Sequence, residues 1–299
     1  MRIPNLTFVV FTYNEEARLP LVIRNFRSYG RILVVDNYST DRTRDIAKEQ
    51  GCDVLLNRNE GGFMENQETC DNVQSAVRTD WMFWLAADEL VAADALEELE
   101  RLIRSERYDV ICMVRKNYFQ GAFCHDIAIG YRARAFKKNT IDFRNNKIHE
   151  FGRIVAPKER VYYMPSRYFV HHLISNTAAT YLETIQRYTE IEKKVRAPEE
   201  LDRPLPYLLL LPFKALWSDY LLKGGIRGGR QAVHLSALMM IYSLLKAIKG
   251  YEAKMGLTAD EIAKRNRQIA EMILQTIPSA EIASPTDGRQ ETFSPQNTP

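Results

Sequence analysis

The sequence predicts an α/β fold with a mostly parallel sheet, and three observations support this prediction. Short apolar runs alternate with helical stretches in the order β-α-β-α-β-α-β between residues 6 and 86, a pattern typical of parallel strands joined by right-handed crossovers. Three of these runs end in polar or acidic residues, at TYNEE, VVDNYST and LAADE. Because open α/β sheets bind ligands beyond the carboxyl ends of their strands, we expect these three ends to form a site.

Local patterns predict the individual elements. Apolar residues recur at helical spacing from Leu19 to Phe26. Ser39 and Thr40 are expected to cap the next helix, and Gly51 to end it. In chain order we expect a strand with its polar end at 6–16, a helix at 19–26, a strand from 31, a helix to 50, a strand at 53–56, a helix at 65–78, a strand from 81, a helix at 92–104, a strand at 109–115, short strands and turns at 117–163, a strand at 168–175, and helices at 178–195, 207–222, 232–248 and 258–277.

The segment WMFWLAADE, residues 81–89, is the most informative of these. A buried strand ends there in two acids, Asp88 and Glu89. Carboxylates are hard oxygen ligands suited to Mg²⁺ or Mn²⁺, and a metal held by one or two carboxylates usually also binds substrate phosphates. The alternative is a strand end followed by a helix whose N-terminus favours acids.

The order of motifs resembles one known family. TYNEE, VVDNYSTDRT and the ADE after an apolar strand resemble an inverting family 2 glycosyltransferase with the GT-A nucleotide-sugar fold. NEGGFMENQE, NKIHE and DYLLKGGIRGG are similar to segments of its branch of lipopolysaccharide-core glucosyltransferase-like enzymes. The resemblance spans roughly residues 5–255. It implies an α/β GT-A fold, a nucleotide-sugar donor and a divalent metal, Mg²⁺ or Mn²⁺.

The resemblance also implies roles for particular residues. Asp36 would bind the edge of the base, Glu16 would lie near the ribose, and Asp88 would hold the metal. The residues that it assigns to the nucleotide-sugar are Thr12, Tyr13, Asn14, Glu16, Asp36, Asn37 and Asp41. One departure stands out, because Ala86 occupies a position where the family usually has an acid. Its loss is expected to weaken metal binding or to change how the donor's ribose is held.

The acceptor side is expected within residues 117–163. By the resemblance, Glu150 of NKIHE would take the proton from an acceptor hydroxyl, and His149 would orient that hydroxyl or contact phosphate. An exposed His-Glu pair in a loop is the alternative, and Asp126 is a competing carboxylate.

Other polar residues are weaker candidates for the site. In YFVHHLIS, the resemblance assigns His171 to the metal or the diphosphate, and backbone-satisfied histidines are the alternative. Arg132 and Arg134 are candidates to balance substrate phosphate.

Net charge, cysteine spacing and a missing motif argue against several classes of protein. A net charge of +3 is too small to indicate nucleic-acid binding, and the turn after the first strand lacks the G-x-G-x-x-G of a nicotinamide-dependent dehydrogenase. The four cysteines lack C-x-x-C spacing, which predicts reduced, mostly buried thiols in a cytosolic protein. The first core strand begins within six residues of the start, so we expect no signal peptide.

The C-terminal part changes character. We expect a catalytic domain at 1–175, a helical region at 176–277 and a disordered tail at 278–299, rich in proline. Two apolar helices flank the basic segment KGGIRGGR, with Trp217, Tyr220 and Tyr242 placed for a headgroup boundary. This pattern predicts peripheral attachment to the anionic inner face of the cell membrane, the alternative being helices that pack on the core or form a homodimer interface.

The sequence therefore predicts a metal-dependent inverting glycosyltransferase acting in cell-envelope polysaccharide synthesis. It would move a sugar from a uridine diphosphate sugar to a glycan or lipid-linked acceptor. A sugar nucleotidyltransferase and a non-catalytic scaffold that retains the fold are the two alternatives.

Overall fold

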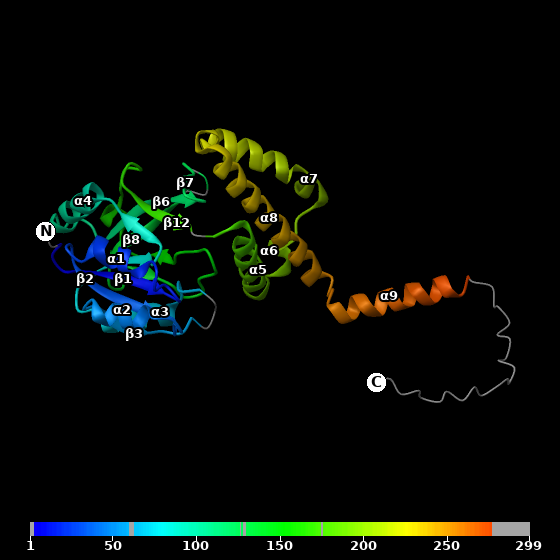
Figure 1. Ribbon diagram of the computed structural model, residues 1–299, viewed down its shortest axis with the longest axis horizontal. Helices are drawn as coiled ribbons and strands as arrows, with labels where there is room; N and C mark the ends of the chain where they lie inside the picture. The colour runs from blue at the N-terminus through cyan, green and yellow to red at the C-terminus, as the bar shows by residue number, and fades with distance from the viewer. Residues whose placement is uncertain (1–2, 60–62, 126, 128–129, 175, 277–299) are drawn as a thin grey trace, which may run out of the picture. The chain divides into compact units, whose positions relative to one another are not determined.

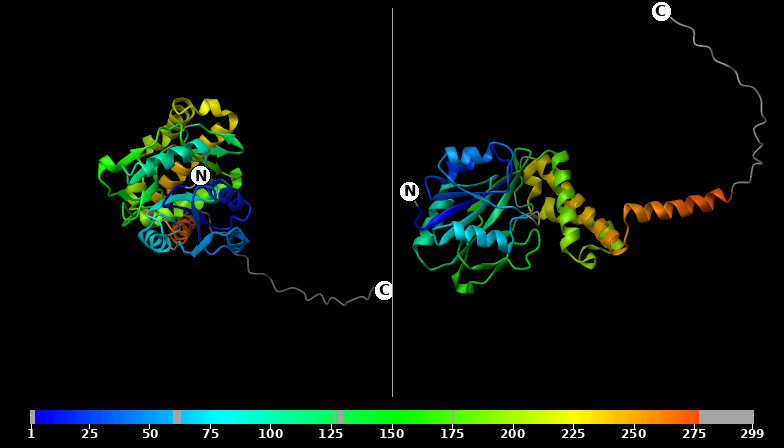
Figure 2. Two further views of the ribbon diagram at one scale, coloured as in Figure 1. Left: turned by 90° about the vertical axis from the view of Figure 1, so that its left-hand side faces the viewer. Right: turned by 90° about the horizontal axis from the view of Figure 1, so that it is seen from below.

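The computed structural model describes residues 3–59, 63–125, 127, 130–174 and 176–276. The N-terminal half contains a sheet with helices on both faces (Figures 1 and 2). Its elements are β1 (Leu6–Thr12), α1 (Leu19–Phe26), β2 (Arg31–Asp36), α2 (Thr43–Glu49), β3 (Asp53–Leu56), α3 (Gln67–Ala76), β4 (Trp81–Ala86), β5 (Glu89–Val91), α4 (Ala93–Arg104), β6 (Val110–Phe119), β7 (Ala122–Phe123), β8 (Tyr131–Lys137), β9 (Ile141–Asp142), β10 (Arg153–Ile154), the 3-10 turn η1 (Lys158–Arg160), β11 (Val161–Tyr163) and β12 (Phe169–Ile174).

The predicted α/β class is confirmed. The main sheet has the strand order β3-β2-β1-β4-β8-β6-β12-β5. The neighbours among β1–β4 pair in parallel, as do β6 and β12, whereas β8 runs antiparallel to both β4 and β6. The mostly parallel sheet flanked by helices is the architecture that the GT-A resemblance implied.

Side chains alternate between two cores along each central strand. On β1, Phe8 and Val10 pack with α1 and α4, whereas Val9 and Phe11 pack with α3 on the other face. Because both faces are covered, β1 is buried at every position, which explains why its sequence is an uninterrupted apolar run. Packing on both faces thus holds the carboxyl end of β1 in place.

One predicted cap is wrong. Ser39 and Thr40 do not cap α2, since Ser39 donates its hydroxyl proton to Asp36, and Asp41 accepts from the backbone N–H of Thr43 instead. Gly51 does follow the helix in a left-handed conformation (φ 74°), as predicted.

The C-terminal half is helical. Its elements are α5 (Ala178–Val195), α6 (Pro198–Leu201), α7 (Leu205–Lys214), the π-helical η2 (Ala215–Leu222), the 3-10 turn η3 (Gly225–Gly228), α8 (Gly229–Lys254) and α9 (Ala259–Leu274). Helices α5 and α8 pack on the end of β6 through Phe119, Ile185, Ala232 and Leu235, all buried.

The division of the chain differs from the prediction. The first compact unit runs from Met1 to Met255, and the second begins at Gly256, so no division falls at residue 175. Helices α5–α8 therefore belong with the sheet, because the apolar end of β6 needs their cover. The tail at 278–299 lies outside the described residues.

One helical stretch among the described residues, Gly225–Lys254, is long and apolar enough to cross a membrane by length and composition. Parts of it are committed to the core instead, where Ala232 and Leu235 are buried against β6 and α5. Cys52, Cys70, Cys112 and Cys124 are free thiols, and all but Cys52 are buried, as predicted.

Candidate functional site

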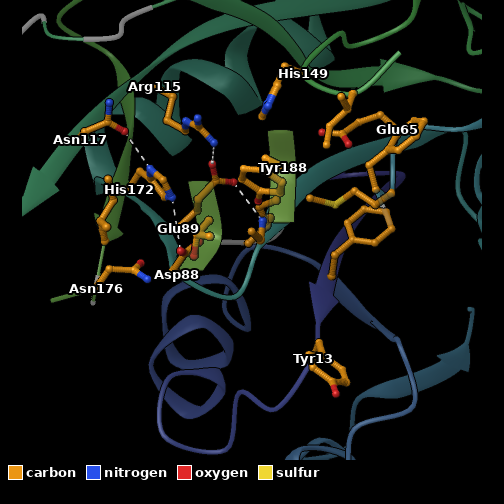
Figure 3. Close-up of a pocket in the computed structure, with 18 of the residues that line it drawn as sticks. Tyr13, Glu65, Asp88, Glu89, Arg115, Asn117, His149, His172, Asn176 and Tyr188 are labelled. Atoms are coloured by element: carbon orange, nitrogen blue, oxygen red, sulfur yellow. Dashed lines mark hydrogen bonds and ion pairs between the residues drawn. The ribbon is translucent and has the colours of Figure 1, made fainter. Parts of the chain in front are cut away.

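A cavity of about 680 Å³ lies at the carboxyl ends of β1 and β4 (Figure 3). Residues following β1, β2, β3 and β4 line one part of it, and residues of β6, β8, β12, α5, α8 and the loop at 148–151 line other parts. Tyr13 and His149 lie well apart across this pocket. The strand ends therefore meet as the sequence predicted, and the helical region supplies a further wall.

The turn that carries Asp88 is held by its backbone. The N–H of Ala87 donates to the carbonyl of Phe11, and the carbonyl of Asp88 accepts from the N–H of Leu173 at 2.8 Å. These bonds tie the turn to the end of β1 and to β12. The carboxylate of Asp88 enters the pocket, and its buried Oδ1 has no hydrogen-bond partner among the described residues. A buried carboxylate oxygen without a partner is costly, and a bound cation would satisfy it.

His172 faces Asp88 across this part of the pocket. Its Nε2 lies 3.3 Å from Oδ2 of Asp88, and its Nδ1 lies 2.7 Å from Oδ1 of Asn117. The amide nitrogen of Asn117 donates to the carbonyl of Ile127, which leaves Oδ1 of that amide to accept from His172. Nδ1 of His172 therefore carries a proton, and in the neutral ring Nε2 presents a lone pair toward Asp88. Two lone pairs facing each other call for a proton or a cation between them.

His171 does not reach this place. In the antiparallel pairing of β12 with β5, His172 lies opposite Glu89 and His171 lies opposite Leu90, so the two histidines point to opposite faces. Nδ1 of His171 is 2.9 Å from the hydroxyl of Tyr118, and burial lowers the pKa of its imidazole. His172, not the expected His171, therefore lies beside Asp88.

Glu89 is a structural carboxylate. It forms a two-pronged ion pair with Arg134, with both N···O distances at 2.9 Å, and also accepts from the backbone N–H of Ala86. Burial raises the pKa of Glu89, but Arg134, Arg115 and His172 outweigh that effect and lower the pKa to about 2. Glu89 therefore fixes the end of β4 and is not available as a second metal ligand.

The donor set fits a divalent metal held partly by substrate. Among the described residues no group of three His, Cys, Asp or Glu side chains converges on one point. Asp88 and His172 supply two ligating groups, and Mg²⁺ is usually bound by one or two carboxylates together with substrate phosphates. The partnerless Oδ1 of Asp88 and the oriented Nε2 of His172 match that arrangement.

Three of the seven predicted nucleotide-sugar residues line the pocket: Thr12, Tyr13 and Asn37. Tyr13 is 53% exposed, so its ring is available for stacking against a base or a sugar. Asn37 accepts from the N–H of Asn59 and so joins the loop after β2 to the one after β3.

The other four lie behind this surface. Asp36 is fully buried and accepts hydrogen bonds from Thr12 at 3.0 Å and from both the N–H and the hydroxyl of Ser39. A base edge could reach it only by displacing these partners. Asn14, Glu16 and Asp41 bind the start of α2 by accepting from backbone N–H groups, namely Asn14 from Thr40, Glu16 from Arg42 and Asp41 from Thr43. These bonds hold the loops after β1 and β2 in place, but the three side chains do not line the pocket.

The loop after β1 contributes an ion pair that the sequence analysis did not identify. Glu15 accepts two short hydrogen bonds from Arg18, and Nη1 of Arg18 lies 3.6 Å from Oδ2 of Asp88. Burial raises the pKa of Glu15 despite this partner. In TYNEE the first glutamate lines the pocket and the second does not; Glu16 instead accepts from the backbone N–H of Arg42.

Of the His-Glu pair predicted for the acceptor side, His149 lines the pocket and Glu150 does not. Glu150 does not line the pocket; it pairs with Arg196 at 3.2 Å and accepts from the N–H of Lys147. His149 has a left-handed backbone (φ 71°), and its ring points into the pocket (Figure 3). Its Nε2 is 2.9 Å from the hydroxyl of Tyr242. Asp126, the competing carboxylate, lies outside the described residues.

Basic residues gather between Asp88 and His149. Arg132 donates to the carbonyl of His149, and burial together with nearby Arg115 lowers the pKa of its guanidinium. Burial raises the pKa of Glu65, which faces these arginines. The sequence did not single out Arg115 and Asn117 of β6, because the pattern of one strand does not show which neighbouring residues its polar side chains will face. For Glu65, the only signal was its place within NEGGFMENQE.

Comparison with known proteins decides the family. The model of glycosyl transferase family 2 matches residues 7–169, more than half of the chain. This chain belongs to that family. The matched part of this family 2 protein contains β1–β11 and the start of β12, and thus Asp88 but neither His172 nor the helices that complete the pocket.

Curated relatives align with part of this family 2 chain. An uncharacterised glycosyltransferase of Rickettsia typhi is 32% identical over 104 residues, 34% of each chain. An undecaprenyl-phosphate 4-deoxy-4-formamido-L-arabinose transferase of Pectobacterium atrosepticum is 34% identical over 131 residues, 38% of each chain. The chain thus spans about a third of the length of these relatives. A mannosyltransferase of Pyrobaculum calidifontis, solved with GDP-mannose and Mn²⁺, is 14% identical with a TM-score of 0.44, covering 91% of this chain and 81% of that one.

Proposed function

We propose that this protein is a divalent-metal-dependent, inverting glycosyltransferase. It would transfer a sugar from a uridine diphosphate sugar to a hydroxyl of a glycan or lipid-linked acceptor, in the synthesis of a cell-envelope polysaccharide. The observation that carries the proposal is the pairing of Asp88 and His172 in a pocket at the ends of β1 and β4. Family membership supports the reaction class, and the polar loops beside Tyr13 and Asn37 support a nucleotide donor.

The donor would lie over the strand ends. Tyr13 and Asn37 would contact the nucleotide, and the diphosphate would extend toward Asp88. Asp88 and His172 would hold Mg²⁺ or Mn²⁺, which when bound would neutralise charge on the departing diphosphate. Arg115 and Arg132 add fixed positive charge to the same pocket. Such preorganised charge stabilises a leaving group without reorganisation of water.

The transfer itself needs one base. An acceptor hydroxyl oxygen would form a bond to the anomeric carbon while the bond from that carbon to the diphosphate oxygen breaks. The hydroxyl proton would pass to the ring of His149, and the bonding electron pair would leave with the nucleoside diphosphate. Burial lowers the pKa of His149, so the ring is neutral at pH 7 and able to accept a proton.

The helical region supports a place at the membrane. Large apolar side chains of residues 205–226 are 57–70% exposed; they are Leu205, Leu209, Leu210, Phe213, Trp217, Leu222 and Ile226. We call this set the apolar surface. Lys214, within this segment, and Arg227 and Arg230, just after it, are exposed and form no ion pair with a described residue, whereas Lys223 is paired with Asp219. Exposed apolar side chains with unpaired basic neighbours fit an anionic lipid surface.

Calorimetry with purified protein would test the proposed reaction. A uridine diphosphate sugar should bind more tightly with Mn²⁺ than without, and the binding should be lost in the Asp88→Ala variant. Absence of any nucleotide binding with Mn²⁺ would instead favour a scaffold. Product formation from UTP and a sugar phosphate would identify a nucleotidyltransferase. In both cases the proposed reaction would be wrong.

A further inference from the structure

A buried carboxylate of α5 lies behind the proposed base. Glu192 is 1% exposed, and its Oε1 accepts from the ammonium group of Lys246 at 3.0 Å. Arg196 lies 3.7 Å from the same oxygen. An ionised carboxylate flanked by two cations has no proton to give, so each of its oxygens can only accept hydrogen bonds.

Tyr242 of α8 connects this carboxylate to the pocket. Its hydroxyl donates to Oε2 of Glu192 at 2.7 Å and lies 2.9 Å from Nε2 of His149. A tyrosine hydroxyl has one proton, and here that proton points to Glu192. The hydroxyl oxygen must therefore accept from His149, which means that Nε2 of His149 carries a proton. In the neutral imidazole the lone pair is then on Nδ1.

The position of the His149 ring is also constrained. The rings of Tyr188 and Tyr242 pack against it edge-on, with centroids 5.0 and 5.8 Å away. Its backbone carbonyl accepts from Arg132, which holds the left-handed backbone at this residue. A left-handed backbone is uncommon for a residue other than glycine and persists where the surroundings hold it.

We propose that the relay Glu192–Tyr242–His149 sets the tautomer of His149, leaving Nδ1 as the nitrogen that accepts the acceptor's proton. The inference rests on the proposed function, since it assigns Glu192 and Tyr242 as positioning residues for that base. Helices α5 and α8, which pack on the end of β6, supply the two residues of the relay. The arrangement parallels a carboxylate that holds a catalytic histidine, with a tyrosine hydroxyl between the two.

Glu192→Gln is the sharpest test, because it keeps the shape and reverses the polarity of the relay. Lys246 requires an oxygen at the Oε1 position, so the new amide nitrogen faces Tyr242 and donates to its oxygen. The tyrosine proton then points to Nε2 of His149, and the proton of the ring moves to Nδ1. In ¹⁵N-histidine-labelled protein, NMR should find Nε2 protonated in the wild type and Nδ1 protonated in the variant.

Two further variants complete the experiment. Tyr242→Phe removes the relay, and His149 should then show a mixture of tautomers. Tyr188→Phe keeps the edge-on ring and should leave the tautomer as in the wild type. Resonances of His149 are identified by their loss in His149→Gln. A tautomer that stays unchanged in both Glu192→Gln and Tyr242→Phe would overturn the inference.

Kinetics separate the relay from the proposed function. Glu192→Gln should lower kcat by roughly 10²-fold or more, as for loss of a general base, while the KM for the donor stays unchanged. Lys246, Arg196 and Arg132 also face the ring, so the pH profile of Tyr242→Phe should shift less than that of Glu192→Gln, which removes a negative charge from among these cations. If the tautomer responds but His149→Gln remains active, the relay holds and the assignment of the base fails. If Glu192→Gln changes neither the tautomer of His149 nor kcat, the relay itself is wrong.

Discussion

Nε2 of His172 on β12 lies 3.3 Å from Oδ2 of Asp88 in the turn after β4, and the two residues meet only in the folded protein. Asn117 fixes the other nitrogen of the ring, so the lone pair of Nε2 points to the carboxylate. A partner that orients a ligating histidine in this way is typical of metal sites. The pair therefore supports the proposed cation site at the sheet edge predicted from sequence.

Replacing Asp88 should abolish metal-dependent donor binding without unfolding the protein. The Asp88→Ala variant loses a carboxylate whose Oδ1 has no partner, so its stability should change little. Titration of Mn²⁺ with UDP by electron paramagnetic resonance measures the loss. Ala86→Asp, the companion variant, should tighten Mn²⁺ binding if the acid missing from this position weakens the site. Mn²⁺ binding that survives in Asp88→Ala would contradict the assignment.

Removing the orienting amide should weaken the metal site indirectly. In Asn117→Ala the ring of His172 loses the acceptor that fixes its tautomer, and mutations of this kind typically cost 10–100-fold in metal affinity. The same Mn²⁺ titration applies. His172→Gln should lose at least as much, whereas His171→Gln, on the other face of β12, is the matched control and should bind Mn²⁺ like the wild type. The opposite ranking of the two histidines would reject this geometry.

The ion pair of Glu89 and Arg134 should make stability depend on pH. The pKa of Glu89 is lowered to about 2 in the folded protein and is about 4.3 in an unfolded chain. Its contribution is therefore complete above about pH 4.3 and is lost as the pH falls toward 2. At about 1.4 kcal/mol per pKa unit it contributes on the order of 3 kcal/mol to the free energy of unfolding.

Urea unfolding of the wild type and Glu89→Gln at pH 7 and pH 3 measures this effect. The difference between the two proteins should shrink at pH 3. Glu98→Gln breaks the surface pair with Arg101 and should cost at most about 1 kcal/mol at either pH. If Glu89→Gln changed the free energy of unfolding equally at pH 7 and pH 3, the partners of Glu89 would not be lowering its pKa.

The two candidate bases should separate in kinetics. His149→Gln should lower transfer to the acceptor by roughly 10²–10⁴-fold with little change in donor affinity, because the ring lines the pocket away from the proposed donor position at Tyr13 and Asn37. Glu150→Gln should lose much less, since this carboxylate pairs with Arg196 away from the pocket. Initial rates under donor saturation give the comparison. The reverse order would restore Glu150 as the base.

Charge at the apolar surface should control membrane binding. Replacing Lys214, Arg227 and Arg230 with Gln should remove roughly 3 kcal/mol, at about 1 kcal/mol per charge, or about a hundredfold in partitioning to anionic vesicles. Co-sedimentation with phosphatidylglycerol vesicles at rising salt measures it. The control replaces the exposed Lys48, Arg78 and Lys158 of the sheet region and should change binding far less.

The wild type decides whether the surface meets lipid at all. It should sediment with anionic vesicles at low salt and less at high salt, because salt screens the attraction. If it stays in solution at low salt, the membrane proposal is wrong. A dimer in sedimentation equilibrium would then assign the apolar surface to a second copy of the chain.

The sequence by itself determined the parallel sheet, the strand ends that form the pocket, and Asp88. Each depends on local pattern, because apolar runs of strand length and the polar residues after them are readable without neighbours. Only the tertiary structure decided which polar residues meet. His172 rather than His171 faces Asp88 because the register of β12 against β5 sets which side chain points to the pocket, and one residue reverses the face.

The same reason explains the other differences. Glu89 looked like a second ligand, but Arg134 arrives from a strand 45 residues later and pairs with it. The sequence placed Tyr242 at a headgroup boundary and gave no sign of a role for Glu192. In the structure Tyr242 contacts both Glu192 and His149, which joins three distant segments. Hydrogen-bond partners far apart in the chain leave no mark in local periodicity, so the chemistry of the acceptor side was decided by packing.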